Sequence, residues 1–321
     1  MKGSVHRTGL ISLGSAVRIR PSLPNFEKMK KSKKFITRTL LSIAKRFSFS
    51  GLNKLILFLH CYTSFKKRIN RKKNTLLFSN DLDEINSFEF QITSQNNEDG
   101  IIEHIFSKIP NKKTFVEIGL TYNEFNTLNL IKNGWEGALI EIQKDECVVV
   151  QSLIKHFYPK STVEIVNASI NKKNINEIVF GTNNDKKIDF FSIDIDGNDY
   201  WVLKNMNLKN VKVVCCEYNH WLGKDKKKIM PYNEKHVWSN NGYWGASLLA
   251  LDDLMVSKGF CLIAVDSSGT NAFYVQNNYS KFFQVLSPKK SWRSVGRFDD
   301  KESASRIREN VLKSSFLEIN N

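Results

Sequence analysis

Acidic residues gather at the end of one strongly apolar segment of this 321-residue chain. Residues 188–193 read Ile-Asp-Phe-Phe-Ser-Ile, and Asp194, Asp196 and Asp199 follow around a Gly-Asn turn. Such a run is typical of a strand buried on both faces of a parallel sheet. In open α/β sheets, ligands bind just beyond the carboxyl ends of such strands. Because unpaired carboxylates are costly to bury, we expect these acids to serve a ligand, a metal or a helix N-terminus.

A purely structural role is the alternative, in which Asp196 or Asn198 caps the next helix and Asp-Gly is only a turn. The apolar residues 211–216 predict a further strand that ends at Glu217, and His220 follows it. Asp196, Glu217 and His220 are therefore the candidate catalytic bases that could take a proton from a hydroxyl group.

Oxygen-bearing side chains at the same strand ends also suit a hard divalent cation. The residues that could hold such an ion are Asp194, Asp196, Glu217 and Asn219. The residue types alone do not decide between a base and a metal ligand, so both remain open from the sequence.

Two upstream strand ends carry a second pattern, which is typical of nucleotide binding. The first ends in Glu117-Ile-Gly119, and Glu141 at the end of the second lies 22 residues after Gly119. Nucleotide-binding βαβ units place an acid on the ribose hydroxyls at an interval of about 20 residues. A glycine also lets the backbone approach a ligand without a Cβ. A turn glycine and a strand-end glutamate without a ligand would give the same pattern.

Alternating apolar and polar residues predict the elements that position these side chains. Strands are expected at 114–119, 137–142, 163–166, 188–194, 211–217, 260–265 and 272–275. Helices are expected from Asn97 to before Pro110, at 128–132, up to about residue 156, at 247–258 and at 304–317. Strand and helix alternate through the fifth strand, which predicts a mainly parallel sheet with helices on both faces. The last two strands should form a closing hairpin.

Positive charge is concentrated near the N-terminus, although the whole chain carries +16. Residues 1–78 hold 19 of the 48 basic residues and one of the 32 acidic residues, so the remainder is nearly neutral. No basic patch with interleaved aromatic residues occurs in that remainder, so we expect no nucleic-acid partner. Basic and apolar clusters alternate over residues 29–75, which favours a helical arm that could contact a membrane surface.

The predicted organisation has four parts. Residues 1–28 are expected to be a non-native leader from a misplaced start, because Val17-Arg-Ile19 can be encoded by the T-loop sequence of a tRNA gene and Met29 opens a lysine-rich run. A basic helical arm at 29–90, a core domain at 91–285 and a C-terminal extension with a helix at 286–321 follow.

Five cysteines show neither a metal-binding spacing nor a disulfide pattern, which favours a reducing compartment. No apolar stretch approaches the roughly 18 residues of a membrane span. We therefore expect a cytoplasmic protein, with peripheral membrane contact through the basic arm.

Several short blocks together resemble FkbM-type S-adenosylmethionine-dependent methyltransferases. They are Ser94-Gln-Asn-Asn-Glu-Asp-Gly-Ile-Ile102, Phe115-Val-Glu-Ile-Gly119, Gly134-Trp-Glu-Gly137, Ile140-Glu141, Ser192 to Trp201, Glu217-Tyr-Asn219, Gly245-Ala-Ser-Leu248 and Gly269 to Tyr274. The order and spacing of the blocks over residues 90 to 280 carry the likeness. The branch it resembles is found among surface-polysaccharide genes.

The resemblance implies a Rossmann-like class I methyltransferase fold, with a mainly parallel seven-stranded sheet and an antiparallel last strand. Glu117 and Gly119 would border the methionine part of the cofactor. Glu141 would hold its ribose, and Asn167 would lie near its adenine. Asp194 and Asp196 would face the reaction centre.

The resemblance also implies O-methylation of a sugar or related hydroxylated acceptor in surface-polysaccharide synthesis, with S-adenosylmethionine as cofactor and a divalent metal as a further option. Two alternatives stay open. Asp194-Ile-Asp196 also resembles the metal-binding motif of nucleotide-sugar glycosyltransferases. The loop after Gly119 reads Leu-Thr-Tyr-Asn-Glu-Phe and lacks the further Gly or Asp residues usual in such families, which would suit a catalytically degenerate fold that binds a partner.

Overall fold

The computed structural model describes residues 52–71, 74–75, 83–181, 183, 185–294 and 301–319. The predicted leader at 1–28 and most of the basic arm lie outside these residues. The chain divides into two compact units, residues 1–59 and 60–321. Helix α2 (Leu52–Ile69) is the longest described element of the arm. Among the described residues, no helix combines the length and apolar character needed to cross a bilayer.

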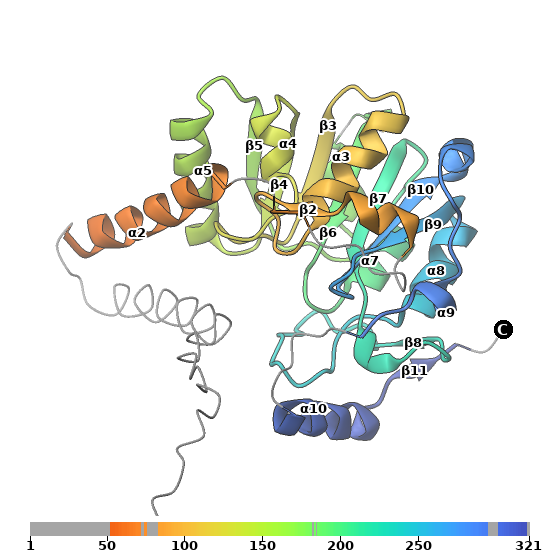
Figure 1. Cartoon of the computed structure of the whole chain (residues 1–321). Helices are drawn as coiled ribbons and strands as arrows, with labels where there is room; N and C mark the ends of the chain where they lie inside the picture. The colour runs from red at the N-terminus through yellow and green to blue at the C-terminus, as the bar shows by residue number, and fades with distance from the viewer. Residues whose placement is uncertain are drawn as a thin grey trace, which may run out of the picture. The chain divides into compact units, whose positions relative to one another are not determined.

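A seven-stranded sheet forms the centre of the second unit, in the order β5-β4-β3-β6-β7-β10-β9 (Figure 1). Its strands are β3 (Thr114–Ile118), β4 (Glu136–Glu141), β5 (Val163–Asn167), β6 (Ile188–Ile193), β7 (Val211–Glu217), β9 (Phe260–Val265) and β10 (Asn271–Gln276). The first five pair in parallel, and β10 is antiparallel to both of its neighbours. The fold class predicted from the sequence is confirmed, including the antiparallel last strand.

Helices cover both faces of the sheet. They are α3 (Glu98–Lys108), α4 (Leu128–Lys132), α5 (Lys144–Phe157), α6 (Ile175–Phe180), α7 (Asp199–Asn205), α8 (Leu248–Ser257) and α9 (Pro288–Ser291). Apolar residues of α6, α7 and α8 form one continuous core with one face of the sheet. On the opposite face, Phe106 of α3 meets Phe190 of β6 edge to face, with ring centroids 6.1 Å apart. Burial on both faces explains why most residues of β6 and β7 are apolar.

Short elements complete the unit outside the central sheet. Before α3 lie β1 (Asn74–Thr75), η1 (Glu84–Phe88) and β2 (Phe90–Gln91), and η3 (Asn277–Phe282) follows β10. After β7 come η2 (His220–Leu222) and β8 (Lys228–Ile229), and the chain ends with α10 (Lys301–Lys313) and β11 (Leu317–Glu318). Beyond β7, therefore, the chain makes a long excursion before it returns to α8.

The C-terminal helix differs from its prediction. We expected a helix over 304–317, but α10 ends at Lys313 and Leu317 belongs to β11, which pairs antiparallel with β8. Leu317 lies opposite Ile229, so backbone pairing outweighs the helical periodicity there. The four-part domain division stays a prediction.

Candidate active site

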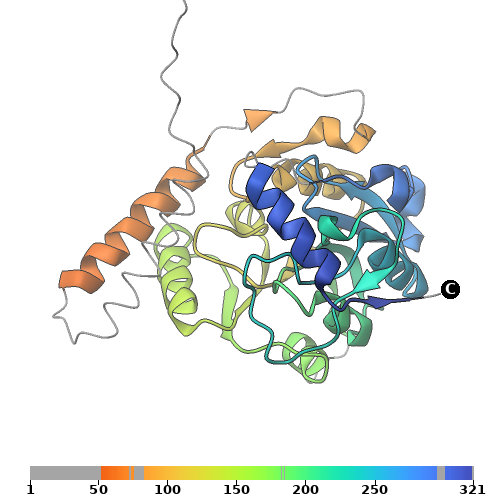
Figure 2. The same ribbon diagram turned by 90° about the horizontal axis from the view of Figure 1, so that it is seen from below.

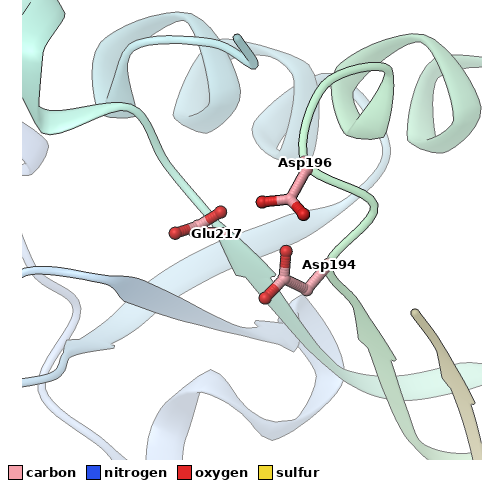
Figure 3. A group of neighbouring side chains, drawn as sticks. All are labelled: Asp194, Asp196 and Glu217. Atoms are coloured by element: carbon pink, nitrogen blue, oxygen red, sulfur yellow. The ribbon is translucent and has the colours of Figure 1, made fainter. Parts of the chain in front are cut away.

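Three carboxylates converge at the carboxyl ends of β6 and β7 (Figure 3). Asp194 and Asp196 follow β6, and Glu217 is the last residue of β7. One oxygen from each side chain lies within 4.8 Å of the other two. Asp194 and Glu217 are half-buried and Asp196 is exposed. The structure therefore brings together three of the predicted site residues at one position.

A tight turn at residues 194–199 presents Asp196 to this position. The backbone N–H groups of Ile195 and Gly197 donate to the buried carboxylate of Asp199, at 2.9 and 3.0 Å. Asp196 has a φ of 58°, a left-handed conformation that costs most side chains energy and that Asp tolerates better than most.

The structural alternative for this turn fails in its simplest form. Asn198 occupies the N-cap position of α7 but makes no side-chain capping bond. Its amide nitrogen donates instead to the carbonyl of Asn233. Asn198 is thus not the capping side chain that the alternative requires.

Gly119 allows two strand ends to meet. Its φ is 78°, and a Cβ built on it would lie 1.7 Å from the carbonyl oxygen of Asp194. The sequence suggested that this glycine frees space for a ligand. That reason is wrong, because the neighbouring strand end fills the space. Gly119 matters for the site through the position of Asp194.

Glu117 lies beneath the loop that follows Gly119. Its carboxylate accepts hydrogen bonds from the backbone N–H groups of Asn126 and Thr127 and from the Thr127 hydroxyl. The side chain is only 3% exposed, and burial raises the pKa of Glu117 to about 7. The structure therefore places Glu117 where it shapes the turn into α4.

Glu141 and Asn167 end neighbouring strands and are register partners. The Glu141 carboxylate accepts from the backbone N–H of Leu120 at 3.1 Å through one oxygen and from that of Gln143 at 2.8 Å through the other. A carboxylate oxygen can accept more than one hydrogen bond, so each keeps capacity for a ligand hydroxyl. The Asn167 amide donates to the carbonyls of Glu141 and Ile142, both at 2.9 Å.

Ile142 is a candidate binding residue that the sequence reading missed. Its side chain is 63% exposed, unusual for an isoleucine beside two polar strand ends. We expected residue 142 to be the last residue of a buried strand. In the structure β4 ends one residue earlier, and Ile142 projects from the edge. The acid immediately before it was the only signal in the sequence.

The loop after Gly119, whose sequence differs from the family pattern, is held in place by its own buried side chains. Leu120, Tyr122 and Phe125 are buried, and Thr121 and Glu124 bond to each other through their backbones. The backbone N–H of Tyr122 donates to Glu146. Apolar packing and carboxylates thus hold a loop that other nucleotide-binding proteins build from glycines.

Asn219 and His220 are buried within the chain segment that leaves β7. The Asn219 amide nitrogen donates to the carbonyls of Gly242 and Trp244, and its oxygen accepts from the backbone N–H of Trp221. These bonds commit Asn219 to its own loop. Of the four residues predicted for a cation, Asp194, Asp196 and Glu217 lie together, whereas the Asn219 amide is bonded within its own loop. His220 packs against the Trp221 ring and is 8% exposed.

The loop at residues 223–245 rests on the 194–199 turn, a contact that no sequence pattern indicated. The backbone N–H of Gly245 donates to the carbonyl of Gly197 at 3.1 Å. Asn198 and Asn233 bond reciprocally through side chain and backbone. The His236 ring lies against Gly197, where a Cβ would come within 2.4 Å of its Cδ2.

The N-terminal end of α3 also reaches this edge of the sheet. Glu98 is fully buried and accepts a hydrogen bond from the side-chain amide of Asn271, the register partner of Glu217. Burial, with the nearby Asp266 carboxylate, raises the pKa of Glu98 to about 7. Asp99 accepts from three successive backbone N–H groups, those of residues 92–94, and so fixes the start of the helix.

Comparison with known protein families identifies the class. Residues 127–260 match a family described as the methyltransferase FkbM domain. This range contains Glu141, Asp194, Asp196 and Glu217. The match over these residues supports a methyltransferase, as the sequence resemblance predicted. The match favours this class over the glycosyltransferase alternative.

Solved structures with a similar arrangement have low sequence identity. The N-terminal domain of EvdMO1 with SAH bound is 10% identical, with a TM-score of 0.38, over 68% of this chain and 94% of that chain. An S-adenosylmethionine-dependent methyltransferase from Clostridium acetobutylicum ATCC 824 is 8% identical, with a TM-score of 0.36, over 56% of this chain and 90% of that chain. A protein of the NADB-Rossmann superfamily from Streptococcus agalactiae is 12% identical, with a TM-score of 0.36, over 59% of this chain and 71% of that chain. No curated protein sequence gave a significant match.

Proposed function

We propose that this methyltransferase transfers a methyl group from S-adenosylmethionine to a hydroxyl of a sugar or related hydroxylated acceptor, within surface-polysaccharide synthesis in the cytoplasm. The observation that carries the proposal is the FkbM match over the residues that form one carboxylate-lined sheet edge. The acceptor class rests on the sequence resemblance and on the presence of carboxylates able to take a hydroxyl proton.

The cofactor is proposed to lie across the ends of β3, β4 and β5. Glu141 would accept the ribose hydroxyls, since both of its oxygens keep acceptor capacity while the Leu120 and Gln143 amides hold them in place. Ile142, exposed beside Glu141, would cover one face of the adenine. Asn167 would fix that strand end, and Gly119 would place the methionine end near Asp194.

Bound S-adenosylmethionine would supply an activated methyl group on a positively charged sulfur. The chain's own residues would contribute alignment and proton removal. Asp196 or Glu217 would take the proton from the acceptor hydroxyl as its oxygen forms the bond to the methyl carbon. The carbon–sulfur bond would break in the same displacement, and its electron pair would stay on sulfur as S-adenosylhomocysteine leaves. Both carboxylates lie at one position, so either could receive the proton.

A divalent cation at the same position is a second candidate contributor. Three carboxylates whose oxygens lie within 4.8 Å of one another suit Mg²⁺ or Mn²⁺, which would also relieve their repulsion. Mn²⁺ titration followed by electron paramagnetic resonance tests this directly. Asp196→Asn should weaken binding at least tenfold. Asp185→Asn, which alters an exposed acid before β6, is the matched control.

Transfer of a radiolabelled methyl group from S-adenosylmethionine to a panel of monosaccharides and nucleotide sugars tests the proposed reaction. We expect label in at least one hydroxylated acceptor, in a linkage that resists mild base as an ether does. Label confined to protein or nucleic-acid acceptors would contradict the acceptor class. Binding of cofactor without transfer to any class would support the degenerate alternative.

A further inference from the structure

The segment from Lys301 to Ile319, which we call the C-terminal segment, lies outside the residues matched to the FkbM family. Its helix α10 lies at the side of the molecule to which the carboxyl ends of the parallel strands point (Figures 1 and 2). We predicted it only as an extension that contains a helix. Its contacts show that it touches the loop at 223–245, which we call the acceptor loop.

Helix α10 is seated on a glycine of the acceptor loop. Ile307 and Val311, each 6% exposed, form a small buried cluster with Leu222. Gly242 lies directly beneath them, because a Cβ there would lie 2.6 Å from Val311 Cγ2 and 2.7 Å from Ile307 Cγ2. Gly242 also has a φ of 81°, which a glycine adopts without strain. The absence of a side chain at Gly242 therefore lets the helix pack directly on the backbone of the loop.

The residues after α10 fasten the same loop at two further points. Tyr243 donates from its hydroxyl to the carbonyl of Ser315, and its ring meets that of Phe316 edge to face at 5.0 Å. Strand β11 pairs with β8, and the backbone N–H of Ile319 donates to the carbonyl of Lys227 at 2.9 Å. Helix, side chains and backbone thus all bind one loop.

The inner side of that loop carries the contacts to the reaction centre. Asn219, two residues beyond Glu217, bonds to the carbonyls of Gly242 and Trp244. Gly245 bonds to Gly197, next to Asp196. Gly242 therefore has Val311 on one side and Asn219 on the other. A displacement of α10 would therefore change the positions of both strand ends that supply the carboxylates.

We propose that the C-terminal segment is the outer wall of the acceptor half of the site and determines which hydroxylated acceptor is admitted, by holding the acceptor loop against the 194–199 turn. This inference rests on the proposed function for the identity of the acceptor. The cofactor half at the ends of β3, β4 and β5 makes none of the contacts described for this segment and does not depend on it.

A double variant tests the proposal in the full-length chain. Ile307→Asp with Val311→Asp puts two carboxylates into the buried contact and should release α10. Asn310→Asp with Leu312→Asp is the matched control, because it adds the same charges to the same helix at exposed positions.

Hydrogen exchange measured by mass spectrometry is the main readout. In the double variant we expect exchange at least tenfold faster in residues 194–199 and 223–245, with unchanged exchange in residues 119–121 and 141–143. The dissociation constant of S-adenosylhomocysteine should stay within twofold, while methyl transfer to the sugar panel falls at least tenfold. The control should match the wild type in every measurement.

Two outcomes would overturn the proposal. One is an acceptor loop that keeps its slow exchange although α10 itself exchanges freely. The other is equal acceleration throughout the sheet, which would make the segment a general stabiliser. Failure of the wild type to methylate any sugar would count against the proposed function alone. Hydrogen exchange needs no acceptor, so it still tests whether the C-terminal segment holds the acceptor loop.

Discussion

Asp196 combines a left-handed backbone, with a φ of 58°, and a carboxylate that faces two others. Strained residues persist where the surroundings hold them, and they concentrate at functional sites. Asp199 supplies that hold through its bonds to Ile195 and Gly197. The acids that follow β6 could therefore be picked out from the sequence. Only the structure shows that Asp199 holds the turn, whereas Asp196 faces the other two carboxylates.

Asp196→Asn should separate catalysis from folding. Asparagine also tolerates the left-handed conformation, and losing one of three like charges should leave the melting temperature equal or higher. Methyl transfer should fall by roughly 10²–10⁴-fold, the range typical of general acid–base residues. Calorimetric melting and the transfer assay on the same preparation check this. Full activity in a well-folded variant would return the turn to a structural role.

The burial of the Glu117 carboxyl group should make the stability of the fold depend on pH. Burial raises its pKa from 4.5 to about 7, so the folded state holds a proton that the unfolded state has lost between those values. Stability should therefore fall as pH rises from about 4.5 to 7, as the buried carboxyl is forced to ionise. Glu98 acts in the same direction.

Glu117→Gln removes this ionisation. The variant should lose less stability than the wild type between pH 5 and pH 7, even if the replaced hydrogen bonds lower its stability at every pH. Urea unfolding at several pH values gives the comparison. Identical slopes for the two proteins would contradict the burial of an ionisable group at this position.

At the scale of elements, the sequence predicted every strand of the central sheet, because buried parallel strands are short apolar runs bounded by turn residues. It predicted the helix end at Lys313 poorly and missed β8 and β11. Two-residue strands contain no periodicity, and they form only because α10 brings Leu317 opposite Ile229. The exposure of Ile142 was also missed, because the predicted strand extended one residue beyond the end of β4.

The close approach of Gly119 to Asp194 predicts that a side chain at residue 119 pushes two strand ends apart and destabilises the fold. Gly134 provides the control, since it has a similar φ of 76° but nothing lies within 4 Å of its built Cβ. Gly134→Ala should lose about 1–2 kcal/mol from left-handed strain alone. Gly119→Ala should lose more than that and should also weaken S-adenosylhomocysteine binding, because it displaces Asp194. Equal losses in urea unfolding would show that the contact with Asp194 is unimportant.

At the scale of the whole molecule, the sheet edge divides into two halves with different supports. Backbone amides hold Glu141 on the β3–β5 side, whereas the acceptor loop and the C-terminal segment enclose the β6–β7 side. The first half follows from strand-end motifs that a sequence displays. The second depends on contacts between residues far apart in the chain, such as Gly242 with Val311, which no local pattern encodes.

Calorimetric titration with S-adenosylhomocysteine tests the central claim, that this edge of the sheet is the cofactor site. We expect saturable binding with one site per chain. Charge-assisted hydrogen bonds contribute about 1.5–3 kcal/mol each, so Glu141→Ala should weaken binding at least tenfold. Glu141→Gln keeps one acceptor oxygen for the loop and should give a smaller loss with the fold intact. Absence of binding to a cooperatively folded wild-type protein, or unchanged affinity in both variants, would contradict the account.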